Sequence, residues 1–355
     1  MAKLKIGNRW IGDEEPTYFI AEIAANHDGQ LERAVKLAHL AAESGADAAK
    51  FQHFRAATLV SARGFEVLRA QVSHQATWKK SVYEVYRDAE TPWEWTETLK
   101  RACQEAKIEF LSAPYDLDAV DMLEPLLPAY KVGSGDITWI EELEYIAGKG
   151  KPVILATGAS DLGEVQRAVD AILAVNPHLV LMQCNTNYTG DRENFRHLHL
   201  NVLRTYAAMY PGVVLGLSDH APGHAAVLGA VALGARAIEK HFTDDCRREG
   251  PDHGFALDPP AWREMVERTR ELELALGRGN KVIQPNERQT VVVQRRCLRA
   301  ARDLVPGHVV GRQDIEVLRP APDDAVFPYA IASVIGQRLR RPLFRGDHFR
   351  WTDLE

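Results

Sequence analysis

The sequence predicts an α/β protein in which a (β/α)8 TIM barrel is followed by a small β-rich domain. Eight short runs of apolar and β-branched residues are each followed by a stretch of helix length, from residue 18 to about residue 277. A doubly wound open sheet is the competing architecture, but the chain has no early GxGxxG motif. Around residues 276–287 the alternation gives way to Gly, Asn and Pro, which indicates a linker.

The expected strands follow one another at intervals that leave room for one helix each. In chain order they are Phe19–Ile23, Ala46–Gln52, Glu109–Ala113, Ala129–Gly133, Pro152–Thr157, Leu179–Cys184, Val213–Ser218 and Ala235–Phe242. The segment Thr91-Pro92-Trp93-Glu94 predicts a helix start, because it combines an N-cap residue, a proline and a capping-box glutamate. Gly45 and Gly234 are expected to end helices just before a strand begins. The connection from His53 to Glu90 is unusually long and is expected to cover the mouth of the barrel.

The composition limits the classes of function. The chain has 355 residues, an apolar share of 46% and a formal net charge of −6, so we expect a folded, mildly acidic protein for which nucleic acid is a poor partner. No apolar run is long enough to cross a bilayer, and residues 1–10 show no signal-peptide core. The four cysteines form no CxxC pair, which disfavours structural zinc and a disulfide scaffold and favours a cytoplasmic location.

We expect three segments: a barrel domain over residues 1–280, a linker over 281–294 and a second domain over 295–355. The last segment carries 11 arginines, no lysine and 8 acidic residues, which usually means a solvated face but would also suit an anionic ligand. A 39-residue repeat in this segment predicts a pseudo-two-fold β domain that turns at a glycine in each half. Its members Leu304, Gly307, Val310, Asp314, Ile315 and Glu316 recur as Leu343, Gly346, Phe349, Asp353, Leu354 and Glu355.

Polar side chains gather where the expected strands end, which is where barrels of this type carry their chemistry. Lys50 and Lys131, together with Ser134 in a Gly-Ser-Gly turn, predict a cradle for a phosphate or a carboxylate. The structural alternative is that a lysine at a strand end only pairs with a neighbouring carboxylate. Many Gly-Ser-Gly triplets, likewise, are merely turns.

Two histidines end consecutive strands, so their rings are expected to converge on one metal ion. Imidazole groups such as those of His220 and His241 suit Mn, Zn, Fe or Co, and a nearby carboxylate from Glu22 or Asp252 would favour a harder ion such as Mn or Mg. A single histidine at such a place is usually a hydrogen-bonded structural residue. The pair on adjacent strands favours the metal site.

These residues occur in an order that resembles the sialic acid synthase family, the phosphoenolpyruvate-condensing nonulosonate synthases. The matching motifs are IAEIAANHDG (20–29), GADAAKFQ (45–52), FLSAPYD (110–116), AYKVGSGD (129–136), ILATG (154–158), GLSDH (216–220), GAVALGARAIEKHFT (229–243) and GPD (250–252). Residues 297–320 resemble the antifreeze-like, or SAF, domain of that family. The likeness spans nearly the whole chain.

The resemblance implies a metal-dependent condensation of phosphoenolpyruvate with an open-chain N-acetylated aldose and water, which gives a nine-carbon 2-keto acid and phosphate. It implies that Glu22, His220 and His241 are catalytic. The two histidines would hold the metal ion, with Mn2+ favoured and Mg2+ or Co2+ as alternatives. The residues implied to bind the substrates are Lys50, Lys131, Ser134, Asp136, Asn26, Ser112, Thr157, Asn185, Tyr188, Ser218, Asp252 and Arg319.

The resemblance also implies an assembly. Arg319 matches an arginine that reaches the N-acetyl group of the acceptor from the partner subunit, because the SAF domain of the family swaps onto the neighbouring barrel. The expected form is therefore a homodimer, with phosphoenolpyruvate and an acetamido sugar as small-molecule partners and with no membrane partner.

Some positions depart from the family pattern. Ala156 stands where a serine is usual, Asn185-Thr186 rearranges the usual hydroxyl groups, and Ala321 replaces a glycine. Asp136 is one methylene shorter than the glutamate of many members. None of these changes removes a metal ligand or a phosphate lysine, but they leave open whether the acceptor is N-acetylmannosamine, a diacetamido-trideoxyhexose or another aldose.

Two other functions compete with the synthase. A metal-dependent aldolase or sugar isomerase on the same barrel would use His220 and His241 but would need no phosphate cradle, so Lys50 and Lys131 discriminate against it. A carbohydrate- or ice-binding tail on a scaffold barrel is the non-enzymatic possibility. The arginine-rich tail argues against a flat ice-binding face.

Overall fold

The computed structural model describes residues 2–68 and 74–355. The chain forms two compact units, one that extends to Gly277 and one that begins at Arg278, and each unit is described by itself. None of the helices in these described ranges is long and apolar enough to cross a membrane.

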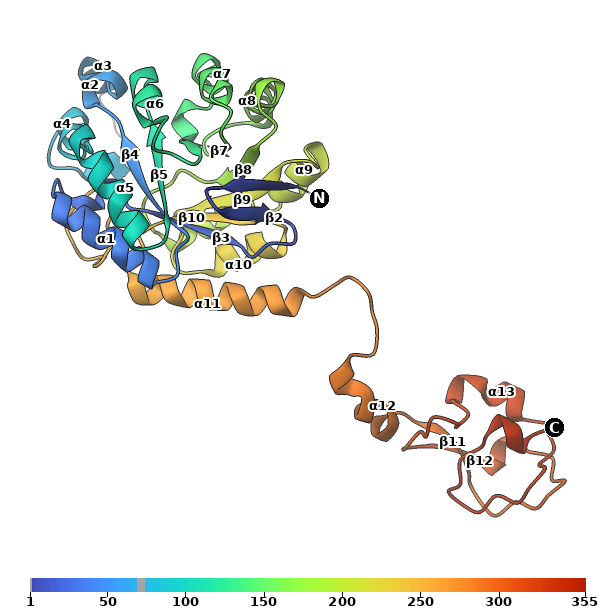
Figure 1. The fold of residues 1–355 in the computed structure, drawn as a ribbon. Coiled ribbons are helices and arrows are strands. Elements are labelled where there is room, and N and C mark those ends of the chain that lie inside the picture. Colours follow the sequence, from blue (N-terminus) through green and yellow to red (C-terminus); the bar gives the residue numbers. More distant parts are fainter. Residues whose placement is uncertain (1, 69–73) are drawn as a thin grey trace. The chain divides into compact units, whose positions relative to one another are not determined.

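The first unit is a closed parallel barrel, as predicted, and all eight expected strands are present (Figure 1). Each strand pairs with the next along the chain, and the barrel closes where β10 pairs with β3, with His241 opposite Glu22. The strands are β3 (Tyr18–Glu22), β4 (Ala48–His53), β5 (Glu109–Pro114), β6 (Tyr130–Val132), β7 (Val153–Ala156), β8 (Leu179–Cys184), β9 (Val214–Asp219) and β10 (Ala237–His241). Because all strands are parallel, their carboxyl ends meet at one end of the barrel.

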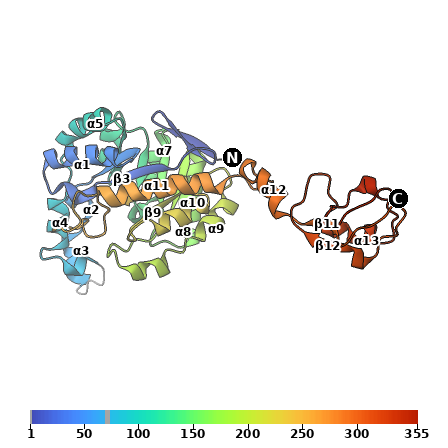
Figure 2. The same ribbon diagram turned by 90° about the horizontal axis from the view of Figure 1, so that it is seen from below.

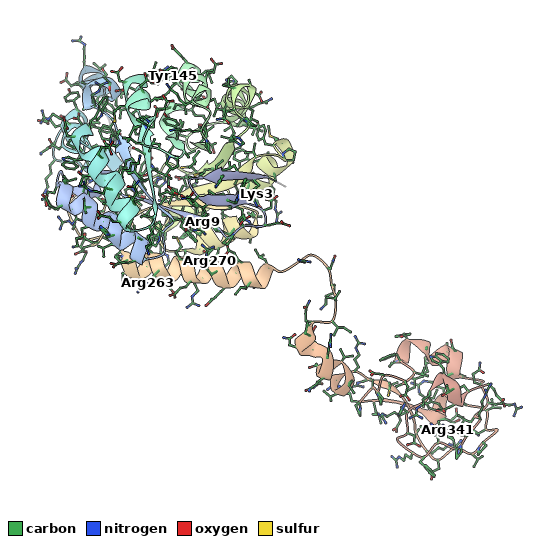
Figure 3. All side chains as sticks on the ribbon, viewed as in Figure 1. Lys3, Arg9, Tyr145, Arg263, Arg270 and Arg341 are labelled. Atoms are coloured by element: carbon green, nitrogen blue, oxygen red, sulfur yellow. The ribbon has the colours of Figure 1, made fainter. Side chains whose placement is uncertain are left out.

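Helices surround the strands, and the main apolar core fills the layer between the two (Figure 2). They are α1 (Leu31–Glu43), α5 (Thr96–Glu105), α6 (Leu117–Leu123), α7 (Ile140–Gly148), α8 (Leu162–Val175), α9 (Val202–Met209), α10 (Ala225–Ala232) and α11 (Pro259–Leu276). Arg270 of α11 donates a hydrogen bond to the carbonyl of Thr17 at 2.8 Å and lies over the ring of Phe19, so it ties the last helix to the first barrel strand (Figure 3).

The predicted helix boundaries are met in part. Gly45 and Gly234 both have positive φ, at 94° and 103°, and each lies between a helix and the following strand as expected. A helical segment does begin after Pro92, but it starts as a 3-10 turn over Trp93–Trp95 and Thr91 does not cap it. The Thr91 hydroxyl instead hydrogen-bonds His27 at 3.3 Å, so a tertiary contact replaces the predicted local cap.

A hairpin that the sequence analysis did not predict closes the opposite end of the barrel. Its strands are β1 (Lys3–Ile6) and β2 (Arg9–Gly12). The buried side chains of Leu4, Ile6 and Ile11 pack in one cluster with interior residues at the starts of the barrel strands. Access to the barrel interior is therefore left to the end where the strands finish.

The described residues of the long connection after β4 include the short α-helices α2 (Ala56–Leu59), α3 (Ala62–Leu68) and α4 (Val82–Asp88). Residues 69–73 of the connection lie outside the described residues. The helix α4 starts with a complete capping box between Ser81 and Glu84. We call residues 53–90 the insert.

The second unit has the internal two-fold repeat that the sequence predicts. It contains α12 (Arg288–Gln294), β11 (Cys297–Ala300), β12 (Ile315–Leu318) and α13 (Ile331–Val334), so part of the expected linker is helical. Leu304 and Leu343 exchange backbone hydrogen bonds of 2.8 and 3.0 Å with each other, which places the pseudo-two-fold axis between them. Gly307 and Gly346 both have positive φ, as turns in each half require.

Each half of the repeat also contains an equivalent internal ion pair. Arg302 pairs with the buried Asp314 at 2.8 Å, and Arg341, 39 residues later, pairs with the buried Asp353 at 2.5 Å. The helix α12 belongs to this unit, because the amide of Ala321 donates to the carbonyl of Val292 at 2.9 Å.

Candidate active site

The site lies where the strands of the barrel finish, and the two-residue period of each strand decides which side chains reach it. On β10, Glu239 and His241 line the central cavity, while Lys240 between them forms a buried ion pair with Asp219 at 2.6 Å on the outer side of the sheet. On β4, Lys50 and Gln52 line the cavity in the same way.

The innermost part of the cavity, which we call the inner pocket, brings together residues from all eight barrel strands or the loops that follow them. Its lining residues are Glu22, Lys50, Gln52, Tyr115, Lys131, Gly133, Ser134, Ala156, Cys184, Tyr188, Ser218, His220, Glu239 and His241. It therefore contains Glu22, both predicted lysines and both predicted histidines.

Two lysines and two carboxylates form one network at the floor of the inner pocket. Lys50 forms an ion pair with Glu22, and its ammonium group lies 3.8 Å from a carboxylate oxygen of Glu239. Lys131 lies 3.4 Å from the other oxygen of Glu239, which also accepts a hydrogen bond from Ser218 at 3.1 Å. All four charged side chains are buried. The lysines do pair with carboxylates, as the structural alternative expected, but they do so inside a cavity.

Burial and pairing act in opposite directions on these groups. Burial by itself would lower the pKa of Lys50, yet Glu22 and Glu239 together hold this pKa above its usual value. Burial alone would likewise raise the pKa of Glu239, but Lys131 and Lys50 outweigh it and keep this pKa low. For Glu22 burial dominates, so its pKa is raised. Glu22 is therefore the carboxyl group of this network that most readily holds a proton.

His220 and His241 lie side by side at the edge of the inner pocket, with ring centroids 5.4 Å apart. Nδ1 of His220 is 2.9 Å from the backbone carbonyl of Asn185. Because a carbonyl only accepts hydrogen bonds, Nδ1 carries the proton and Nε2 keeps its lone pair. Tyr188 packs edge-on against His220, with a centroid distance of 4.4 Å, and fixes the ring from the other side.

The chemistry of these two imidazoles fits a metal ion. Burial lowers the pKa of His220 to about 4, and burial followed by the proximity of His220 lowers the pKa of His241 well below its usual value. Both rings are thus neutral near pH 7, as metal ligation requires. Nδ1 of His241 is buried and makes no hydrogen bond to the described residues. Within residues 2–68 and 74–355 no group of three or more His, Cys, Asp or Glu side chains is arranged around one point, so these residues offer two ligands at this place.

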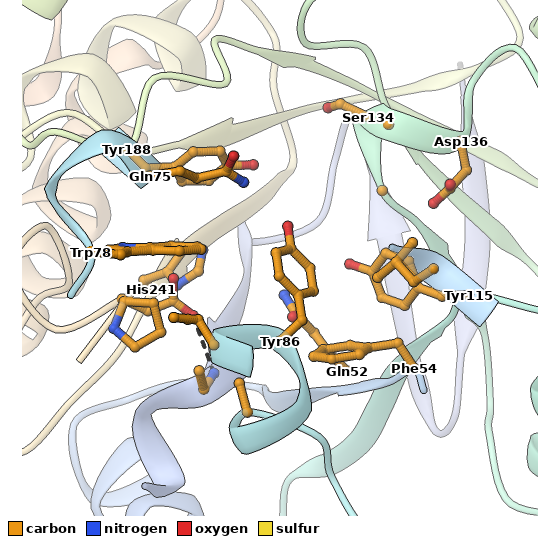
Figure 4. A pocket seen from close by; sticks show the side chains of 18 residues that line it. Gln52, Phe54, Gln75, Trp78, Tyr86, Tyr115, Ser134, Asp136, Tyr188 and His241 are labelled. Atoms are coloured by element: carbon orange, nitrogen blue, oxygen red, sulfur yellow. Dashed lines mark hydrogen bonds between the residues drawn. The ribbon is translucent and has the colours of Figure 1, made fainter. Parts of the chain in front are cut away.

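The wider part of the cavity, which we call the outer mouth, is lined on one side by the insert (Figure 4). The insert contributes Phe54, Leu59, Gln75, Trp78, Val85, Tyr86 and Ala89. The loops after the barrel strands contribute Ala25, Tyr115, Gly133, Ser134, Gly135, Asp136, Tyr188, Pro251 and Asp252, and the strands themselves contribute Gln52 and His241. The expectation that the long connection covers the mouth is confirmed for its described residues.

The charged groups of the outer mouth are acidic. Burial raises the pKa of Asp136 to about 6 and that of Asp252 to about 6. Asp252 accepts a hydrogen bond from the amide of Ala25 at 3.1 Å. Ser134 lies between the two parts of the cavity, and its hydroxyl accepts a hydrogen bond from the amide of Gly158 at 2.9 Å.

Three of the predicted substrate-binding residues point away from the cavity, which corrects the expectation for them. The Ser112 hydroxyl lies on the outer face of β5, where it contacts the carbonyl of Phe51 at 3.0 Å and the ring of His53 at 2.7 Å. Thr157 donates to the carbonyl of Met182 at 2.9 Å on the helix side of the sheet. A side chain one position out of phase with the inward residues faces the helices instead of the ligand.

Asn26 is the third of these residues. It is fully buried, and its amide donates to the carbonyl of Phe242 at 2.9 Å, so it ties the loop after β3 to the loop after β10. Asn185 is placed near the site but acts through its backbone, because its carbonyl orients His220 while its side-chain amide lies 3.3 Å from the carbonyl of His197. Arg319 belongs to the second unit and is exposed at the end of β12.

The structure places several further residues in the cavity. Glu239 is the most important, and strand periodicity could have found it, because it lies two residues before His241 on the same strand. Tyr115, Trp78 and Tyr86 could not be assigned in this way, since they lie outside the strands.

Known proteins resemble this chain over most of its length. The profile described as "NeuB family" matches residues 37–281, which is more than half of the chain. The chain belongs to the NeuB family. The SAF domain profile matches residues 295–355, so the tail of this NeuB family member is a SAF domain.

The relatives of this NeuB family member include named synthases. The N,N'-diacetyllegionaminic acid synthase of Legionella pneumophila is 34% identical over 97% of this chain and 96% of its own length. The human N-acetylneuraminate-9-phosphate synthase is 33% identical over 79% of this chain and 76% of its own length. The crystal structure of the spore coat polysaccharide biosynthesis protein SpsE of Bacillus subtilis superposes with a TM-score of 0.65 at 30% identity and covers 100% of this chain and 99% of that one.

Proposed function

We propose that this chain condenses phosphoenolpyruvate with an open-chain N-acetylated aldose and water to give a nine-carbon 2-keto acid, of the sialic acid type, and phosphate. The observation that carries the proposal is the pairing of Lys50 and Lys131 in the same cavity as His220 and His241. An aldolase or isomerase that handles no phosphate would not need two buried ammonium groups beside such a histidine pair. Membership in the NeuB family supports the same reaction.

The inner pocket would hold phosphoenolpyruvate. The ammonium groups of Lys50 and Lys131 would turn from Glu22 and Glu239 toward the phosphate and the carboxylate of the substrate, and the Ser134 hydroxyl would bind at the rim. Ser218 would stay on Glu239 and keep this carboxylate from following the lysines. The lysines are thus charged and held in place before the substrate arrives.

His220 and His241 would hold a divalent cation, with Mn2+ favoured over Mg2+ and Co2+ because imidazole and oxygen donors occur together here. When bound, this cation supplies Lewis acidity toward the carbonyl oxygen of the acceptor aldehyde. The carbonyl of Asn185 and the ring of Tyr188 keep His220 in the orientation and the tautomer that ligation needs.

The bond changes balance without an additional reactant. The carbon–carbon bond forms between C3 of phosphoenolpyruvate and C1 of the aldehyde, and the aldehyde oxygen takes up one proton. Water adds to C2, the bond between C2 and the phosphate oxygen breaks, and the 2-keto group forms as the added water loses both of its protons. One of these protons balances the proton taken up by the aldehyde oxygen, and the other leaves on the phosphate. Glu22 is the buried carboxyl group with a raised pKa beside the lysines, so it is placed to give and to receive these protons.

A phosphate-release assay with phosphoenolpyruvate, Mn2+ and a panel of acetamido aldoses tests the proposal. We expect release to require both a sugar and the metal, to stop with EDTA and to return when Mn2+ is added. His220→Ala and His241→Ala should lose activity and should also weaken Mn2+ binding measured by electron paramagnetic resonance. If no sugar supports release, or if EDTA has no effect, the proposed reaction is wrong.

We further propose that the active form is a homodimer in which the SAF domain completes the acceptor site of the partner. The support is the match of Arg319 to the arginine of the family and its exposure at the end of β12. Deletion of residues 286–355 should abolish acceptor use but leave the first unit able to bind phosphoenolpyruvate, because the inner pocket lies entirely in that unit. Full activity of a folded truncated protein would contradict the swapped domain.

A further inference from the structure

A buried ion pair lies directly behind the two histidines of the inner pocket, on the outer face of the barrel sheet. Its members, Asp219 and Lys240, are the residues immediately before His220 and His241 in the sequence. We propose that this pair positions the two imidazoles side by side, so that one cation can reach both of them. The inference rests on the metal site of the function proposed above, to which it adds two positioning residues that act only through the histidines.

The strand ladder by itself fixes the two histidines unequally. Asp219 and Lys240 lie opposite each other in the parallel ladder between β9 and β10, and theirs is the last pair of this ladder. Side chains alternate between the two faces of a strand, so the residue after each of them faces the cavity. His241 still belongs to β10 and pairs with Glu22 of β3, whereas His220 lies one residue beyond the end of β9. The position of His220 therefore depends on contacts other than the ladder.

The ion pair supplies such contacts, because it holds the backbone on both sides of His220. The ammonium group of Lys240 donates to a carboxylate oxygen of Asp219 at 2.6 Å and to the carbonyl of Ala221 at 2.6 Å. The other carboxylate oxygen of Asp219 accepts a hydrogen bond from the amide of Ala221 at 2.9 Å. These hydrogen bonds close a ring around residues 219–221, and Lys240 anchors the ring to β10. The backbone of His220 cannot move away from His241 unless the ring breaks.

Other groups orient the imidazole rings themselves. The carbonyl of Asn185 and the ring of Tyr188 contact the ring of His220. Phe255 packs edge-on against both imidazoles, at centroid distances of 5.9 Å and 4.7 Å. These groups restrict how each ring rotates about its side-chain bonds. The ion pair acts instead on the backbone, and it joins the two strands that lead to the histidines.

Stability by itself does not account for a pair of charges at this place. The side chains of Lys240 and Asp219 are 1% and 0% exposed. Taking two charges out of water is costly, and replacement of a buried ion pair by apolar side chains of similar volume is often neutral or stabilising. Apolar side chains would fill the same space, but they could not make the directional hydrogen bonds of the ring. The structural alternative is that the pair only holds β9 and β10 together.

Two double variants remove both charges, so that neither is left buried and unpaired. Asp219→Leu with Lys240→Met keeps a similar volume and removes every hydrogen bond of the ring. Asp219→Asn with Lys240→Met also removes both charges, but the asparagine oxygen can still accept the hydrogen bond from the amide of Ala221. The control is Lys149→Met with Asp121→Leu, which removes a pair of the same residue types and the same 2.6 Å distance between α6 and the end of α7.

The first measurement is Mn2+ binding to EDTA-treated protein, followed by electron paramagnetic resonance of the free ion. We expect the dissociation constant for Mn2+ to rise about 10- to 100-fold in Asp219→Leu/Lys240→Met. It should rise by a smaller factor in Asp219→Asn/Lys240→Met, where one hydrogen bond of the ring remains, and it should not change in the control. The affinity for phosphoenolpyruvate without metal, measured by calorimetry, should be the same in all of these proteins.

Urea unfolding followed by circular dichroism shows whether each variant is folded. An unchanged dissociation constant for Mn2+ in folded Asp219→Leu/Lys240→Met would mean that the pair has only the structural role, and would overturn the inference. If that variant does not fold, an unchanged constant in folded Asp219→Asn/Lys240→Met has the same meaning.

A second measurement needs no metal and separates this inference from the proposed function. In protein labelled with ¹⁵N at histidine, NMR spectra report which ring nitrogen carries the proton, and for His220 in the wild type we expect Nδ1. In Asp219→Leu/Lys240→Met we expect a mixture of both tautomers, because the ring no longer meets the carbonyl of Asn185 at a fixed place. The control should give the wild-type spectrum.

The two measurements fail in different ways. A wild-type protein that binds no Mn2+ would refute the proposed metal site, and the spectrum of His220 would then decide the inference by itself. An identical His220 spectrum in the wild type and in folded Asp219→Leu/Lys240→Met would overturn the inference, whatever the result with Mn2+.

Discussion

The inner pocket and the outer mouth are two parts of one cavity that differ in how they are built. The inner pocket is made mainly of strand residues, and its two lysines are buried against Glu22 and Glu239. The outer mouth is made mainly of the insert and the loops after the strands, and its carboxylates stand beside aromatic rings without a lysine or arginine among the described lining residues. If the proposed function is correct, this difference would place the anionic substrate in the inner pocket and the sugar at the outer mouth.

The largest expected effect comes from removing a cation from the inner pocket. Lys131→Met should lower kcat/KM for phosphoenolpyruvate about 100- to 1,000-fold, since truncation of one partner of a buried charge pair costs about 2–5 kcal/mol. It leaves Glu239 with one cation fewer and thereby adds repulsion toward the anion. The measurement is phosphate release against phosphoenolpyruvate concentration.

Lys36→Met on the surface of α1 is the matched control for this substitution, because it removes the same charge from an exposed position. It should leave the kinetics unchanged. If Lys131→Met also leaves the KM for phosphoenolpyruvate unchanged, the assignment of the anion to the inner pocket and of the sugar to the outer mouth is wrong.

A smaller effect should follow from loosening the outer mouth. His253 bonds Asp28 at 2.9 Å and Thr243 at 2.7 Å, so it braces the loop that carries Asp252. His253→Gln should raise the acceptor KM about 10-fold, which corresponds to loss of about 1.4 kcal/mol of positioning, and should leave the KM for phosphoenolpyruvate unchanged.

The substitution His39→Gln, at a half-buried position of α1, should change neither constant. Equal increases of both constants in His253→Gln would mean that the brace supports the whole site and does not distinguish the two parts.

The ionised carboxyl group of Asp136 should lower the stability of the folded protein by a measurable amount. Its pKa is raised by burial to about 6 in the folded protein, above the unfolded value, so the folded state binds more protons between about pH 4 and pH 6. The stabilising contribution of the protonated form is therefore lost as the pH rises through 6. Asp136→Asn should raise the melting temperature at pH 7–8, and this gain should disappear toward pH 4.

Differential scanning calorimetry at several pH values measures the gain from Asp136→Asn. Asp170→Asn on α8, at an exposed position, should show no such pH-dependent gain. A gain that grows toward low pH would have the wrong sign and would show that Asp136 is stabilised as a carboxylate.

The smallest expected effect concerns one missing hydroxyl. Ala156 lines the inner pocket where its methyl group is nearly fully buried, and Ala156→Ser would add a donor there. One additional hydrogen bond of about 0.5–1.5 kcal/mol predicts a KM for phosphoenolpyruvate that is about 2- to 10-fold lower. A change confined to the acceptor KM would place residue 156 in the wrong part of the cavity.

The sequence predicts a structural feature well when residues close together in the chain determine it, and poorly when the feature depends on residues far apart in the chain. Lys50, Lys131, His220 and His241 were found because a residue near the end of a barrel strand must be close to the ends of all the others. Ser112 lies one residue out of phase with the inward positions of its strand, so its side chain faces away from the cavity. Thr91 does not cap the following helix because its hydroxyl contacts His27, which lies 64 residues away in the sequence. A rule that considers only neighbouring residues does not predict such a contact.

By itself, the sequence determined the barrel, the repeat in the SAF domain and the strand ends that carry charge. These features depend on short-range periodicity, which is written into consecutive residues. Only the tertiary structure decided that Glu239 joins both lysines and that Trp78 and Tyr86 line the mouth. Closure of the barrel and packing of the insert over its end bring these groups together, and both depend on contacts between residues far apart in the chain.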